Sequence, residues 1–101
     1  MKTDKYVVAV IGFSRVEDAL AAIRTFMEEE KVWLFTIAGT SGGMGKEIAE
    51  TLGAPYLYVN ELWQLERECN YLIADIRSDN QAIKNWVMKM KAAGKHGRVI
   101  R

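Results

Sequence analysis

The chain has 101 residues, half of them hydrophobic, which predicts one soluble domain, residues 1–101, with a core of its own. Its net charge of +1 excludes a protein that attracts polyanions through overall charge. One cysteine and one histidine are too few for an internal disulfide or a structural zinc site, so we expect no metal and a cytoplasmic location.

The first predicted element is a strand over residues 6–11, where the run Tyr-Val-Val-Ala-Val-Ile is apolar and rich in β-branched residues. This run is too short to cross a membrane or to form a signal-peptide core, so we expect no membrane partner. Gly12 ends the strand. Ser14 and Glu17 have the spacing of a capping box, which predicts a helix from Ser14 to about Lys31.

A second strand is predicted over residues 33–38, and a glycine-rich loop, residues 39–45, follows it. The loop leads into a short helix over residues 44–52, and Gly53 stands where a helix-ending glycine belongs. A third strand over residues 56–59 comes next.

The second half of the chain repeats this alternation. We expect a helix over residues 60–69 capped by Asn60, a strand over 71–74, a helix opened by a capping box of Ser78 and Gln81, and an edge strand over 98–100. Strands that alternate with helices predict right-handed crossovers and a parallel sheet. The fold class is therefore α/β: a Rossmann-like three-layer α/β/α sandwich with about five mostly parallel strands and helices on both faces.

Ligands of such sheets bind outside the carboxyl ends of the strands, so the loops there matter most. In the middle loop, glycines allow close backbone approach, hydroxyls add donors, and the following helix start favours an anion. The candidates for binding a phosphate are Gly39, Thr40, Ser41, Gly42, Gly43, Gly45 and Lys46. The loop is not a Walker A motif, since five residues separate Gly39 from Gly45, and the alternative is a simple turn.

The loops after the first and fourth predicted strands add further polar groups at the same edge. Arg15 suits a phosphate or carboxylate, with a surface arginine as the alternative, and Phe13 suits either a base or the core. The fourth strand is followed by a polar loop, residues 75–80, in which Arg77 either binds the ligand or pairs with an aspartate. The remaining ligand candidates are Gly12, Ser14, Ser78 and Asn80, and the candidate catalytic acids are Glu47, Asp75 and Asp79.

Two features leave macromolecular partners open as alternatives. Residues 81–101 carry six lysines and arginines and no acids, which predicts either nucleic-acid binding or a solvated helix face. Trp63 and Trp86 are expected in the core or at an interface, which leaves a homodimer open.

The stretches over residues 7–15, 36–55 and 69–74 resemble the YspA-like branch of the SLOG superfamily, which has a Gly-Ser-Arg loop after its first strand and a Ser-Gly-Gly loop after its second. The resemblance implies a Rossmann-like domain that binds a nucleotide or an ADP-ribose-like derivative. Relatives include LOG-type phosphoribohydrolases and the DNA-binding protein DprA. It places Gly12, Ser14 and Arg15 in the first ligand loop and residues 39–45 in the phosphate loop.

The chain departs from that pattern at several positions. Phe13 is inserted in the first loop, Thr40 replaces a glycine, and Lys46-Glu47 replaces Ala-Asp. The loop after the fourth strand lacks the Gly-Thr pair, and the glutamate of the LOG-type enzymes is missing from the next helix. We therefore expect a nucleotide-binding sensor, carrier or sequestering protein. The alternatives are a small phosphoribohydrolase or N-glycosidase-like enzyme, and an interaction module that uses the basic C-terminal segment.

Overall fold

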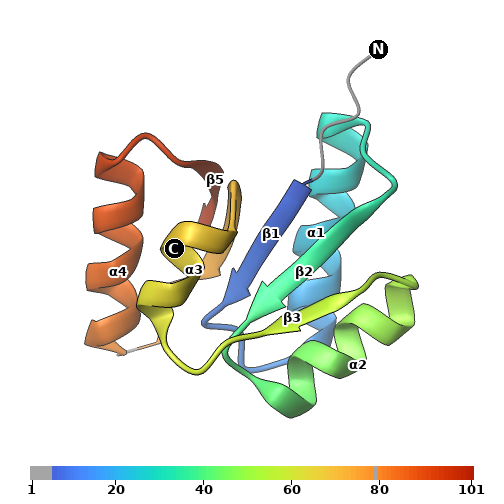
Figure 1. Ribbon diagram of the computed structural model, residues 1–101, viewed down its shortest axis with the longest axis horizontal. Helices are drawn as coiled ribbons and strands as arrows, with labels where there is room; N and C mark the ends of the chain where they lie inside the picture. Colours follow the sequence, from blue (N-terminus) through green and yellow to red (C-terminus); the bar gives the residue numbers. More distant parts are fainter. Residues whose placement is uncertain (1–5, 79) are drawn as a thin grey trace.

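The computed structural model describes residues 6–78 and 80–101 of the chain. Within this part, five strands form one parallel sheet, and four helices connect them (Figure 1). The strand order β3-β2-β1-β4-β5 matches the first five strands of the Rossmann order, in which the order of the strands along the sheet reverses between β1 and β4. The predicted Rossmann-like three-layer α/β fold is confirmed.

The elements alternate along the whole described chain. In order they are β1 (Tyr6–Ile11), α1 (Val16–Glu30), β2 (Phe35–Gly39), α2 (Gly42–Leu52), β3 (Tyr56–Tyr58), α3 (Leu62–Glu68), β4 (Tyr71–Asp75), α4 (Gln81–Ala92) and β5 (His96–Ile100). The crossover helices α1 and α2 lie on one face of the sheet, and α3 and α4 lie on the other (Figure 1).

Each face of the sheet has its own apolar cluster because successive strand side chains point to opposite faces. In β1, Val8 packs with α1 and α2, while Ala9 and Ile11 pack with α3 and α4. The continuous apolar runs in the sequence thus reflect burial on both faces, as expected of a parallel sheet.

An aromatic group anchors the first cluster near the amino ends of the strands. The Phe26 ring of α1 lies 5.5 Å from the Phe35 ring and 4.5 Å from the Tyr71 ring, measured between centroids. Tyr6 adds an edge contact to Phe26 at 5.4 Å. These rings hold α1 against β1, β2 and β4 at the end of the sheet opposite the strand exits.

The predicted starts of three helices are wrong. Arg15, not Ser14, is the N-cap residue of α1, and its side chain makes no capping bond. The predicted capping box does not form, because with Arg15 as the N-cap residue Glu17 is the second residue of the helix and not the third. Glu17 pairs with Arg15, and Glu17 and Asp18 stabilise the helix start by their charge. In α3 the N-cap residue is Glu61, not the predicted Asn60, and Gln64 Oε1 accepts from the Glu61 N–H at 3.0 Å.

The start of α4 differs in a similar way. Asn80, not Ser78, caps α4, because its Oδ1 accepts the Ile83 N–H at 3.1 Å. Because Asn80 is the N-cap residue and Gln81 is the first residue of the helix, the predicted capping box of Ser78 and Gln81 does not form, and Ser78 is exposed.

The predicted bounds of two strands and one loop also need correction. Trp33 and Leu34 are 64% and 87% exposed and precede β2, because α1 ends in a left-handed Lys31 and the chain needs these residues to reach the sheet. β5 begins at His96, two residues before the predicted edge strand over residues 98–100. The glycine loop is shorter than predicted: Gly39 ends β2, and the other three glycines belong to α2.

Candidate functional site

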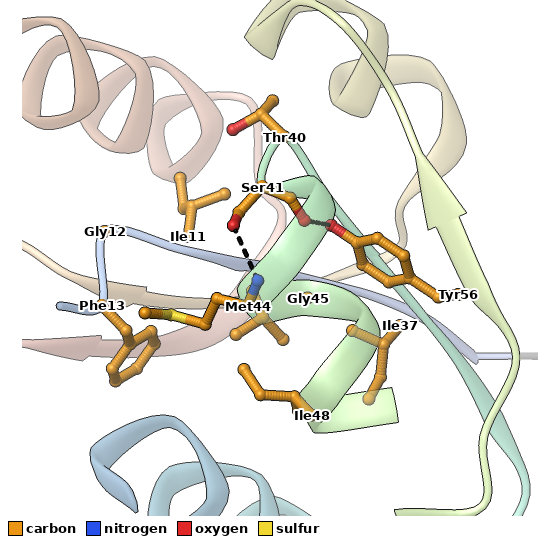
Figure 2. A pocket seen from close by; sticks show the side chains of 11 residues that line it. Ile11, Gly12, Phe13, Ile37, Thr40, Ser41, Met44, Gly45, Ile48 and Tyr56 are labelled. Atoms are coloured by element: carbon orange, nitrogen blue, oxygen red, sulfur yellow. Dashed lines mark hydrogen bonds between the residues drawn. The ribbon is translucent and has the colours of Figure 1, made fainter. Parts of the chain in front are cut away.

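A cavity of about 50 Å³ lies at the carboxyl ends of β1 and β2, between the β1–α1 loop and the first two turns of α2. Figure 2 shows Phe13 and Met44 on one side of it and Tyr56 on the other. Ile37 and Ile48 line it as well, so most of its wall is apolar. The cavity has room for one or two water molecules, at about 30 Å³ of liquid volume each.

The start of α2 forms the polar rim of this cavity. Ser41 is the N-cap residue, and its Oγ accepts the Met44 N–H at 3.3 Å (Figure 2). The N–H groups of Gly42 and Gly43 begin the helix, where backbone donors have no acceptor within the helix itself. Both glycines are exposed, and a Cβ on Gly43 would meet no atom within 4 Å. The backbone there is open to a ligand.

Tyr56 holds this helix start in place, although the sequence argument did not single it out. Its hydroxyl donates to the Ser41 carbonyl at 2.5 Å, and its ring covers Gly45, where a Cβ would lie 2.1 Å from the ring (Figure 2). Burial raises the pKa of Tyr56, and the bond to Ser41 opposes that rise. Gly45 is therefore explained by packing against Tyr56, not by contact with a ligand.

Tyr58 lies beside the same helix start and was also missed. A Cβ on Gly42 would be 4.0 Å from Cε1 of Tyr58, and the residue is 52% exposed. The period of two along β3 could have suggested this position, since Tyr56 and Tyr58 must point to the same face of the sheet. The sequence alone does not show which helix covers that face.

The β1–α1 loop brings Gly12 and Phe13 to the cavity but leaves Ser14 and Arg15 exposed. Gly12 has φ of +83°, and a Cβ there would lie 2.2 Å from the Asp75 carbonyl oxygen. This loop therefore packs directly on the end of β4. Arg15 NH2 lies 3.3 Å from Glu17 Oε2. The pKa of Glu17 is lowered, first by a hydrogen bond from the Glu17 backbone and second by the hydrogen bond from Arg15.

At the exit of β4, Asp75 is buried and fully engaged with Arg77. Its Oδ1 accepts from Arg77 Nε at 3.0 Å and from the Arg77 backbone N–H at 2.9 Å, and its Oδ2 accepts from Arg77 NH2 at 2.7 Å. The side-chain hydrogen bond to Arg77 is the main reason that the pKa of Asp75 is lowered. A carboxylate in this state is ionised at neutral pH and is poorly suited to donate a proton.

The other candidate acids lie elsewhere. Glu47 is exposed on α2, and its backbone carbonyl accepts from Thr51 Oγ1 at 2.8 Å. Asp79 lies outside the described residues. Lys46 is exposed in the second turn of α2, and Asn80 has a structural role as the cap of α4.

The basic residues near the C-terminus serve several local contacts. Lys89 pairs with Glu66 of α3 at 3.1 Å, Arg98 pairs with Glu29 of α1, and Lys95 Nζ donates to the Cys69 carbonyl at 2.9 Å. These contacts tie α4 and β5 to neighbouring elements and give the segment a structural function. Of the two candidate interface tryptophans, Trp86 is buried and Trp63 is 55% exposed.

Among residues 6–78 and 80–101, no three His, Cys, Asp or Glu side chains gather in a way that could hold a metal ion. No helix in the same ranges is long and apolar enough to cross a membrane. Comparison with family models, curated proteins and solved structures finds no match to the chain. The resemblance to the SLOG superfamily therefore stays a prediction.

Proposed function

We propose that the chain binds a nucleotide or nucleotide-derived ligand, with its phosphate on the N–H groups of Gly42 and Gly43. The observation that carries the proposal is the exposed, glycine-built start of α2 on the rim of a cavity at the strand exits. The first turn of α2 has no acidic residue that would repel an anion. An anion is therefore favoured at α2.

The ring of Tyr58 supports a nucleotide over a simple anion. Half-exposed aromatic rings provide stacking surfaces for bases, and this ring lies next to Gly42. The cavity itself is far smaller than the roughly 300–1,000 Å³ of a site that encloses a drug-sized molecule. A nucleotide would therefore place its base on the surface over Tyr58 and only a small group in the cavity.

Among residues 6–78 and 80–101, the surroundings of the candidate acids favour binding without catalysis. Asp75 is held by Arg77, and Glu47 is exposed to solvent. Arg77 lowers the pKa of Asp75, whereas general acid catalysis of glycosidic cleavage requires a carboxyl pKa raised toward neutrality. A sensor, carrier or sequestering role follows from this chemistry, with ADP-ribose-like molecules among the ligands to screen.

The proposal is tested by titrating ¹⁵N-labelled protein with adenosine 5′-monophosphate and following the Gly42 and Gly43 amides. Gly43→Val keeps the backbone N–H but fills the open space through which a phosphate would approach it, so binding should weaken by about tenfold or more, because one charge-assisted hydrogen bond contributes about 1.5–3 kcal/mol. Ala92→Val, at an exposed position at the end of α4, is the matched control and should bind like the parent. Equal affinity of Gly43→Val and the parent would reject this site.

A charge reversal gives a second arm. Lys46→Glu should also weaken binding, because it places a negative charge in the second turn of α2. Arg24→Glu makes the same change on the exposed side of α1 and corrects for the altered net charge.

A further inference from the structure

The guanidinium of Arg77 is shared by two carboxylates that differ in burial. The Asp75 side chain is 6% exposed and lies 2.7 Å from Arg77 NH2. The Asp18 side chain, in the first turn of α1, is 42% exposed, and its Oδ2 lies 3.4 Å from the same nitrogen. Asp75 therefore fixes the guanidinium, while Asp18 makes a longer contact at the surface.

Arg77 and its two carboxylates lie where the order of the strands along the sheet reverses, between β1 and β4. β1 and β4 are neighbours in the sheet, yet the chain leaves them toward opposite sides, which is the position where open parallel sheets bind ligands. Gly12 joins this position to the cavity, because Gly12 lines the cavity and packs against the Asp75 backbone. Because β1 lies between β2 and β4, Arg77 stands two strand exits away from the proposed phosphate site, with Gly12 between them.

We infer that Arg77 is an anion-binding group and that Asp18 is an internal occupant which a ligand phosphate displaces. The inference rests on the proposed function, because it assigns a second contact to the same ligand. Arginine suits the planar, forked recognition of phosphate, and an exposed ion pair at 3.4 Å is weak enough to exchange. Asp75 acts as a positioning residue, since its three bonds keep the guanidinium directed outward when Asp18 leaves.

The neighbouring charges supply the matched control. Glu17 stands beside Asp18 in the same helical turn, but its carboxylate pairs with Arg15 and not with Arg77. Both variants are made in an Arg15→Gln background, because Glu17→Gln would otherwise release Arg15, itself a candidate ligand group. In that background Glu17→Gln and Asp18→Asn remove the same charge from the same turn, and only Asp18→Asn vacates Arg77. Any difference between them measures competition for Arg77 apart from general electrostatics.

The test follows the Arg77 Nε–H signal by NMR during titration with adenosine 5′-monophosphate, with adenosine as the arm that lacks a phosphate. Asp18→Asn should bind the monophosphate about two- to fivefold more tightly than Glu17→Gln, the range expected for losing an exposed ion pair. The gain should disappear in an Arg77→Gln background. Asp18→Ser should show the same gain, and it serves as a second variant because the asparagine side chain of Asp18→Asn could itself hydrogen-bond to Arg77 or the ligand.

The outcomes separate this inference from the proposed function. An Arg77 signal that moves with the monophosphate but not with adenosine, together with tighter binding by Asp18→Asn, supports the inference. It is overturned if the Arg77 signal stays still while the Gly42 and Gly43 amides shift, or if Asp18→Asn binds no better than Glu17→Gln. If only the glycine amides fail to shift, the placement of phosphate on α2 is lost while the role of Arg77 stands.

Discussion

Replacing Gly45 by alanine tests how β3 supports the candidate site. An alanine Cβ would lie 2.1 Å from the Cζ and hydroxyl oxygen of Tyr56, so the ring must move and its bond to Ser41 must lengthen or break. Overpacking costs about 1–3 kcal/mol and the lost hydrogen bond about 1 kcal/mol. The better helix propensity of alanine returns about 0.5–1 kcal/mol, which leaves a net loss of about 2 kcal/mol.

Urea unfolding followed by tryptophan fluorescence measures this loss, with Gly43→Ala as the matched control. Gly43 has open space around its Cβ position, so the control should be as stable as the parent or slightly more stable. In a Tyr56→Val background the penalty at Gly45 should vanish, because the ring that causes it is gone. Equal stability of the two alanine variants in the parent background would refute the account of Gly45 as a packing position.

Two further predictions concern the contact between β1 and β4. Gly12→Ala should destabilise the protein by about 3 kcal/mol or more, because its Cβ would meet a backbone oxygen at 2.2 Å in a left-handed conformation; a urea midpoint near that of the parent would contradict this. Asp75 should make stability acid-sensitive: Arg77 lowers its pKa in the folded state, so the stabilisation is complete above the ordinary carboxyl pKa and is lost as pH falls through the lowered value. Urea midpoints from neutral to strongly acidic pH should therefore fall less steeply in Asp75→Asn than in the parent, and parallel curves would disprove the assignment.

The order of elements could be predicted from the sequence because the apolar runs are long and unambiguous. Residues 6–11 form a strand at the predicted bounds, and residues 71–75 differ from prediction by one residue. The helix starts were harder, because several residues near each start can cap. Ser14 and Ser78 fit the capping-box pattern, but the chain caps α4 with Asn80 and starts α1 beyond Arg15.

The site was less accessible to sequence reasoning because its key contacts join distant segments. The bond from Tyr56 to Ser41 depends on the pairing of β3 with β2, where Tyr56 lies opposite Ile37. No local pattern gives that register. The Arg77–Asp75 pair spans two residues and was one of the two readings of Arg77, but its extension to Asp18 requires α1 to pack beside β4.

The separation of the apolar interior by the sheet has a practical consequence for engineering. The cavity and the start of α2 belong to the face covered by α1 and α2, whereas Trp86, Val87 and Met90 of α4 pack on the reverse face. When two substituted residues do not touch each other and share no neighbours, their effects on the free energy of unfolding usually add. Repacking beneath α4 can therefore compensate for a stability cost at the ligand edge while leaving the shape of that edge unaltered.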